Sequence, residues 1–314
     1  MQAKTVSVGP VTAAVTNQIC ASQTPYAGQM VLNGAGATFS INNVAASQDP
    51  AAAGYLTLAA TVVSFSQPQY VYVTSAADDT AFTFTVTGTD VNGQPLTEVI
   101  TGANTKARVS TNQFTTVSSV YVSGNSGSVQ VGSFAYATFT GSTARQVTIT
   151  PTGDESSNSF IVTGTDSNGS PISETVAGKN ATASTTNAYF LTVTSIKIAS
   201  NAANAIVAGM TNTASSPWVR FDDFAPSYIS IQCDVTGSVT YVVQSSLDDP
   251  NSPFNPVNPT SMVWVNTSDI AVVGATTTQQ SNFLFAPKFA RVYLSTTSTG
   301  SVSATFLQSS NGPI

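Results

Sequence analysis

The residue types that most often carry catalysis are scarce in this chain, so the search for chemistry begins with its carboxylates. The 314 residues include no histidine, which excludes Ser-His-Asp and Cys-His catalysis and histidine-bound metal. Asp90 and Glu98 recur 76 positions later as Asp166 and Glu174. Two carboxylates roughly 5–10 Å apart can hydrolyse a glycosidic bond, and each of these pairs flanks one predicted turn.

Two interpretations of these four acids are open. In one, each pair meets across its turn and hydrolyses a polysaccharide. In the other, Asp90 and Asp166 accept hydrogen bonds from turn amides, as Asp does in Asx turns, while Glu98 and Glu174 face solvent. The second is favoured, because identical acids in two copies follow from duplication without any shared reaction. We therefore predict that the chain is not an enzyme, and we expect no catalytic residue.

Acidic pairs in three loops raise the question of bound calcium. Asp78-Asp79 recurs as Asp154-Glu155, and Asp248-Asp249 lies in a proline-rich segment. Oxygen ligands in loops suit Ca²⁺, but none of these pairs has the spacing of an EF-hand. Solvated turns are the favoured interpretation, so neither a metal nor a cofactor is predicted.

The two cysteines, Cys20 and Cys233, lie more than 200 positions apart. This separation excludes a metal site built on closely spaced cysteines. Because free cysteine is among the most buried residue types, we predict two buried thiols. A single structural disulfide is the alternative.

Composition excludes several classes of protein. Charged residues make up 8% of the chain and hydrophobic residues 41%, a balance that disordered proteins do not show. The net charge is −6 and the nine Lys and Arg are scattered singly, so nucleic acid is not expected as a partner. No apolar run approaches the ~20 residues of a membrane helix, and the first residues do not resemble a signal peptide. We expect the chain to fold in the cytoplasm of the cell that makes it.

An internal duplication organises the middle of the chain. Residues 84–104 and 160–180 are identical at 12 of 21 positions, and the match extends without a gap over 70–124 and 146–200. Apolar residues alternate with Thr around Phe84 and Val86, which is typical of a half-buried β-strand. The Asn-Gly pair in each copy is a strong signal for a hairpin turn. The residues predicted to build these turns are Asp90, Asn92, Gly93, Pro95, Asp166, Asn168, Gly169 and Pro171.

We predict an all-β protein of four parts. Residues 69–140 and 141–215 each offer five or six strands, the count of a small Ig-like β-sandwich. Residues 216–314 form a C-terminal β-sandwich or jelly-roll module, in which 228–235 and 239–244 are expected to pair as a hairpin. Residues 1–68 have weaker patterning and are expected to form an N-terminal arm with short strands.

Most aromatic residues lie in alternating strands, which favours a place in the core over a sugar-binding surface. The segment 218–224 is less regular and falls between two predicted modules. Trp218, Phe221 and Phe224 are therefore candidates for packing between modules or between subunits.

The repeats resemble those of structural proteins from tailed bacteriophages. The resemblance rests on the pattern TGTDxNGxPxxE, followed by the segments 114–120 and 190–196. It extends to a C-terminal module with VTGSVTYVVQSSLDD at 235–249, Trp264, and Phe306-Leu307-Gln308 near the end. These motifs cover about residues 69–314 and are structural in kind, so they imply a virion component without choosing its position.

This resemblance implies a multi-copy, non-enzymatic particle protein, either a capsid decoration or head-fibre protein or a minor tail-associated one. It also implies assembly as a homo-oligomer, a trimer or larger ring, in contact with other virion proteins after folding in the host cytoplasm. The residues 1–68 could attach it to the particle. One alternative is a tail fibre or adhesin whose C-terminal module binds a host surface glycan. A polysaccharide depolymerase is the less favoured alternative.

Overall fold

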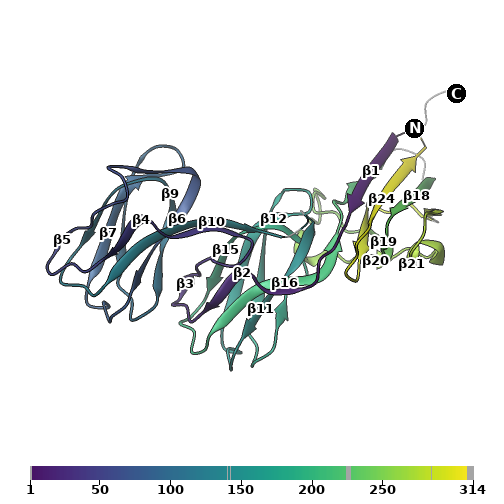
Figure 1. Ribbon diagram of the computed structural model, residues 1–314. Helices are drawn as coiled ribbons and strands as arrows, with labels where there is room; N and C mark the ends of the chain where they lie inside the picture. Colours follow the sequence, from purple (N-terminus) through teal and green to yellow (C-terminus); the bar gives the residue numbers. More distant parts are fainter. Residues whose placement is uncertain (1, 140, 142, 224–227, 284, 310–314) are drawn as a thin grey trace.

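The computed structural model shows an elongated all-β molecule of three sandwich-like modules in a row (Figure 1). It describes residues 2–139, 141, 143–223, 228–283 and 285–309. Within these residues the helical structure is limited to two 3-10 turns, η1 (Pro259–Ser261) and η2 (Ile270–Val272). We call the modules distal, middle and terminal, and the terminal module contains both the first and the last strand.

The distal module is built from seven consecutive strands around a core that includes Phe84, Val86 and Phe114, all fully buried. One side is formed by β8, β7, the second half of β9, and β5, and the other by β4, β10, β6 and the first half of β9. The strands are β4 (Ala37–Gln48), β5 (Gly54–Tyr55), β6 (Val63–Ser75), β7 (Thr83–Thr89), β8 (Pro95–Thr101), β9 (Ala107–Val122) and β10 (Val129–Thr138).

The middle module repeats this pairing strand by strand. Phe160 pairs with Val176 as Phe84 pairs with Ile100, and β11 pairs with β14 as β6 pairs with the first half of β9. The strands are β2 (Val15–Gln23), β3 (Gly28–Gln29), β11 (Ala144–Pro151), β12 (Ser159–Asp166), β13 (Pro171–Ala177), β14 (Ser184–Thr185), β15 (Phe190–Ile198) and β16 (Ile206–Ser215).

The terminal module packs a four-stranded sheet, in the order β1-β24-β18-β22, against β19 and β23. The strands are β1 (Gln2–Val8), β17 (Val219–Arg220), β18 (Ile229–Thr236), β19 (Tyr241–Ser246), β20 (Val265–Asn266), β21 (Val273–Ala275), β22 (Gln279–Phe283), β23 (Phe289–Leu294) and β24 (Ser301–Gln308).

The hairpin expected between residues 228–235 and 239–244 is wrong. β18 pairs with β24 and β22, whereas β19 pairs with β23, β20 and β21. The intervening turn crosses from one sheet to the other. This arrangement buries Ile231 and Cys233 against Tyr241 and Val243 in one core, so both strands use their apolar faces.

Residues 1–68 were expected to form an arm, but the described part, 2–68, is distributed over all three modules. β1 pairs with β24 of the terminal module, β2 with β16 of the middle module, and β4 with β10 of the distal module. Their apolar side chains enter the respective cores: Val6 and Val8 in the first case, Ile19 in the second and Val44 in the third.

The modules are consequently nested. The whole distal module is inserted between β3 and β11 of the middle module, and both lie between β1 and β17 of the terminal module. The chain runs out to the distal end and returns, so β1 and β24 lie side by side at the opposite end (Figure 1). The entropic cost of closing a loop grows only as the logarithm of its length, about 0.6 kcal/mol per doubling, so such insertions are thermodynamically tolerable.

A second, shorter internal match, which was not predicted, accompanies the nesting. Residues 17–25 (NQICASQTP) match 42–50 (NNVAASQDP) at five of nine positions. In each copy one glutamine binds the main chain of the returning segment twice. Gln23 donates to the carbonyl of Val31 (2.7 Å) and accepts from its N–H (3.2 Å). Gln48 does the same with Thr57 at 2.9 and 2.8 Å. The first copy therefore completes the middle module, and the second copy completes the distal module.

Replacing Val44 by Asp tests whether this segment belongs to the distal core. We expect the free energy of unfolding to fall by at least about 3 kcal/mol, because an uncompensated charge would be buried. Chemical denaturation measures this, with exposed Asn42→Asp on the same strand as the control. Equal, small effects of the two substitutions would contradict the assignment.

Candidate functional site

The first predicted turn is organised by the carboxylate of Asp90. One of its oxygens accepts hydrogen bonds from the main-chain N–H groups of Asn92 and Gln94, both at 2.8 Å. Gly93 has a φ of 75°, a left-handed conformation that glycine adopts without strain. Pro95 begins β8 opposite Thr89. Among the described residues, the hydrogen-bond partners of this carboxylate are amides of its own turn.

The second turn has the same construction. Asp166 accepts from the N–H groups of Asn168 (2.8 Å) and Ser170 (2.9 Å), Gly169 has a φ of 80°, and Pro171 begins β13. Burial raises the pKa of Asp166 and outweighs the three turn amides that would lower it.

The glutamates of the motif were expected to face solvent, but they bind main-chain N–H groups instead. The carboxylate of Glu98 accepts hydrogen bonds from the main-chain N–H groups of Thr111 and Asn112 in β9. Glu174 accepts from the N–H of Asn187 (2.7 Å) and of Ala188 (2.9 Å) just before β15. Both side chains are half-buried and brace an edge strand against the next long strand.

The two acids of each copy do not converge. Glu98 lies opposite Val86 in the ladder, and Asp90 follows Val86 by four residues, beyond the Thr89–Pro95 pair. At about 3.4 Å per residue, the two acids are separated by roughly 14 Å along the strand. Both carboxylates are occupied by main-chain N–H groups. Over the described residues, no group of three or more Cys, Asp and Glu side chains could hold a metal ion.

The acidic pairs considered as calcium ligands were expected to be solvated turns, but Asp79 and Glu155 are buried and anchor loops. Asp79 is buried and accepts from the N–H of Gly127 (2.9 Å) and from the Ser75 hydroxyl. Asp78 caps its own turn by accepting from the N–H of Thr80 (3.1 Å). In the terminal module, Asp248 accepts from the N–H of Val263 at 2.6 Å.

Glu155 occupies the position of Asp79 in the middle module and is likewise buried, at 1% exposure. It accepts hydrogen bonds from the Asn158 amide (2.6 Å) and from the main-chain N–H groups of Ala203 (2.9 Å) and Asn204 (2.6 Å). Burial by itself would raise the pKa of Glu155, but these hydrogen bonds outweigh it and hold the pKa below its ordinary value.

Two further identical positions of the duplicated motif also have structural roles. Gly88 and Gly164 sit at bulges where a Cβ would lie 1.9 Å from a carbonyl oxygen of the neighbouring strand. The hydroxyls of Thr89 and Thr165 each bond a threonine hydroxyl across the sheet at 2.7 Å. These contacts give both copies of the two positions a role in the sheet.

Trp218 lies where the middle and terminal modules meet. Its N–H donates to the side-chain oxygen of Asn168 (2.9 Å), and the Asn168 amide donates back to its carbonyl (3.1 Å). Its ring stacks on Trp264 with centroids 5.6 Å apart. Phe221 instead packs in the terminal core against Phe283, and Phe224 lies outside the described residues.

Both cysteines are free and buried. This confirms the expectation of two buried thiols. Burial raises the pKa of Cys20 above its ordinary range and that of Cys233 to about 11, so neither is a nucleophile at neutral pH.

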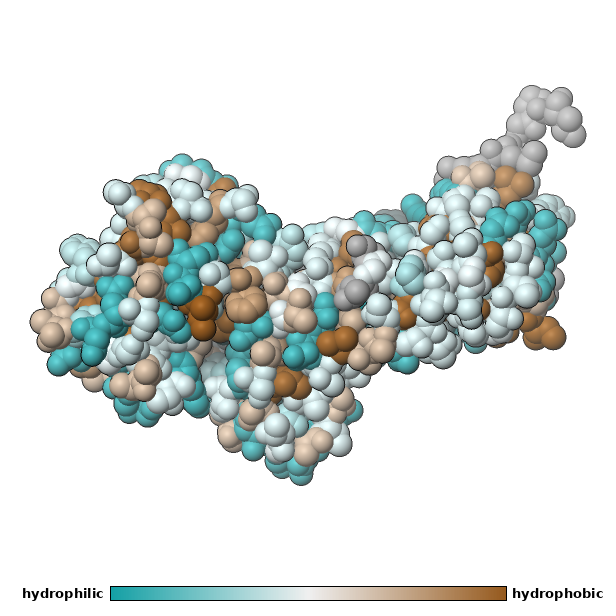
Figure 2. All heavy atoms as spheres, viewed as in Figure 1, coloured by the Kyte–Doolittle hydropathy of each residue, from teal (hydrophilic) through white to brown (hydrophobic). Residues whose placement is uncertain are grey.

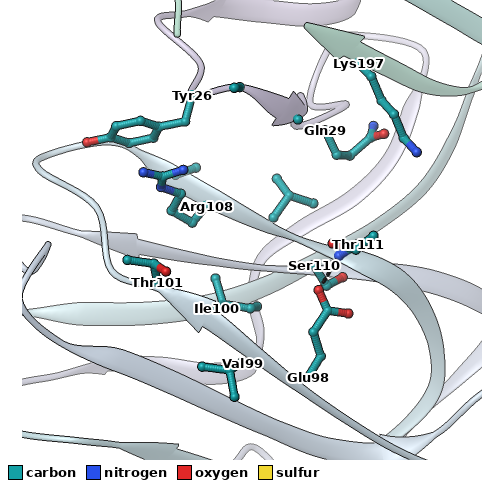
Figure 3. A pocket seen from close by; sticks show the side chains of 14 residues that line it. Tyr26, Gln29, Glu98, Val99, Ile100, Thr101, Arg108, Ser110, Thr111 and Lys197 are labelled. Atoms are coloured by element: carbon teal, nitrogen blue, oxygen red, sulfur yellow. Dashed lines mark hydrogen bonds between the residues drawn. The ribbon is translucent and has the colours of Figure 1, made fainter. Parts of the chain in front are cut away.

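A cleft between the distal and middle modules was not predicted. It has a volume of about 280 Å³ and is lined by Tyr26, Arg108 and Lys197, with the edge strand β8 as one wall (Figure 3). The Arg108 guanidinium carbon lies 3.5 Å from the centre of the Tyr26 ring. These residues come from three distant segments, so no local sequence signal could have grouped them.

Comparison with protein-family models, with curated proteins and with solved structures finds no match for this chain. Among the described residues no helix has the length and apolar character needed to cross a membrane. The proposed function therefore rests on the geometry of these residues and on the sequence motifs.

Glu155→Gln tests the role of the buried loop anchor. At pH 7 we expect a loss of about 2 kcal/mol in the free energy of unfolding, because hydrogen bonds to a charged acceptor are lost. The folded-state pKa is lowered, so the stabilisation is present above the unfolded pKa of about 4.3 and is lost as pH falls through the folded value.

The difference between wild type and Glu155→Gln should therefore shrink as the pH is lowered below about 4. Denaturant titrations across pH measure it, and exposed Asp49→Asn serves as the charge-matched control. A difference that does not depend on pH would contradict the assignment.

Proposed function

We propose that this chain is a non-enzymatic structural protein of a tailed-bacteriophage virion. Present in many copies, it serves as a capsid decoration or head-fibre protein, or as a minor structural component attached to the particle. Its two repeats are small Ig-like sandwiches, and together with the terminal module they form a rod of three modules. The resemblance of the TGTDxNGxPxxE repeats supports the phage assignment.

One observation carries the non-enzymatic part of the proposal. Every carboxylate of the duplicated motif is occupied by main-chain amides of its own module. Asp90 and Asp166 bind turn amides, Glu98 binds amides of β9, and Glu174 binds amides just before β15. A catalytic acid or base must instead be free to reach a substrate. The duplicated acids therefore stabilise two copies of the same module.

The surface supports a role in assembly. Most of the face in Figure 2 has intermediate hydropathy, with hydrophobic residues in separate patches. Over the described residues, β8, β13 and β22 each pair with a single strand. An unpaired edge is a place where another chain can add a strand. Self-association as a trimer or larger ring, and contact with other virion proteins, would use such edges.

One observation favours a second candidate, a tail fibre or adhesin that binds a host surface glycan. Two large apolar side chains of the proline-rich loop in the terminal module are exposed: Leu247 at 67% and Phe254 at 95%. Such side chains could contact a sugar face. A depolymerase is less well supported, because its two acids would have to converge.

Electron microscopy of purified particles tests the proposal. A tagged copy of the chain should be found on the particle in many copies, as a rod of three beads attached to the capsid or tail. Its absence from particles would contradict the proposal, and a position at the distal tip of a tail fibre would favour the adhesin.

Light scattering on the purified protein tests self-association separately. We expect a trimer or larger species with a mass that is a multiple of 32.2 kDa. Substituting Lys for Val99, which is 59% exposed on edge strand β8, should favour the monomer if that edge is used. A monomer at the highest attainable concentration would contradict the oligomer.

A further inference from the structure

Three of the nine basic residues gather around one cleft, although they are scattered in the sequence. Lys106 and Arg108 lie over the Tyr26 ring, with Nζ 5.1 Å and the guanidinium carbon 3.5 Å from its centroid. Lys197 lines the same cleft from β15. Figure 3 shows Arg108 beneath Tyr26 and Lys197 on the opposite side of the opening. In a chain of net charge −6, this is a local concentration of positive charge.

The hydrogen-bonding capacity of this cluster is not used up. The Nε atom of Arg108 is buried and has no hydrogen-bond partner among the described residues. A buried donor without a partner is destabilising. Glu98, the acidic residue of the lining, is engaged by the N–H groups of Thr111 and Asn112. Its carboxylate is thus held by main-chain donors.

The duplication supplies an internal comparison. In the middle module the positions of Lys106 and Arg108 are Thr182 and Ser184, and in the distal module the position of Lys197 is Tyr121. The braces made by Glu98 and Glu174 are kept in both copies. Since the other copy of each of these positions is uncharged and its module still folds, the three cations are not required by the fold of a module.

We propose that this cleft is a binding site for a compact carboxylate ligand, held between Arg108 and Lys197. The guanidinium stacks on Tyr26 through its face, which leaves its N–H edges to bind a carboxylate with the geometry that arginine prefers. The volume of about 280 Å³ is at the small end for ligand pockets and accommodates one acidic sugar residue or one acidic side chain. This site is independent of where the chain sits in a particle.

Calorimetric titration at constant ionic strength tests the proposal with two matched pairs of probes. Glucuronate is compared with glucose, and N-acetylglutamate amide with N-acetylglutamine amide. At least one carboxylate should bind and its neutral partner should not. Which acid binds better identifies a sugar or a peptide as the source of the carboxylate.

Two variants and a control make the test specific. Arg108→Gln should weaken binding at least about tenfold, because a charge-assisted hydrogen bond is lost. Lys197→Gln should weaken it about threefold, as expected for a more exposed charge. Lys179→Gln, an exposed lysine of the middle module, should leave it unchanged.

Thermal unfolding of each variant separates lost binding from lost structure. Should Arg108→Gln fail to fold, Lys197→Gln alone decides the test. The proposal is overturned if neither acid binds the wild type, if acid and neutral probes bind equally, or if the cleft variants retain wild-type affinity.

Discussion

The structure depends on long-range antiparallel pairing between the first strands of the chain and the last strand of each module. Thr5 lies opposite Thr305, 300 positions away, and β2 and β4 make the equivalent contacts with β16 and β10. Each pairing brings apolar side chains into a core that the remaining strands leave incomplete. Forming such non-local contacts costs chain entropy, so the modules depend on one another during folding. The nested order of the strands joins the three modules into one molecule.

The acidic residues serve the same fold by binding main-chain amides. A chain with 8% charged residues places its carboxylates where amides would otherwise be unpaired: in the turns at Asp90 and Asp166, in the braces at Glu98 and Glu174, and in the buried anchor at Glu155. A buried N–H without a partner costs about 1–3 kcal/mol, so these residues stabilise loops and edges. The cations at the distal–middle cleft differ, since the other copies of their positions are uncharged.

Much of the strand content could be predicted from local pattern. The alternation around Phe84 and Val86 and the Asn-Gly turns are local signals, and the structure has strands and turns there. The pairing of β1 with β24 has no local signal. The partner of β18 could not be predicted either, because a short turn suggests a hairpin although the core requires the two strands in different sheets. The match of 17–25 to 42–50 was visible but short, and its spacing differs from that of the main repeat. Arg108 and Lys197 are joined only by the fold.

The central claim is that residues 2–48 are integral strands of three modules, and hydrogen exchange measures this most directly. Amides of β1, β2 and β4 should exchange as slowly as those of their partners β24, β16 and β10. Rapid exchange throughout residues 2–48, with protection retained in the duplicated segments, would show a detached arm and contradict the account.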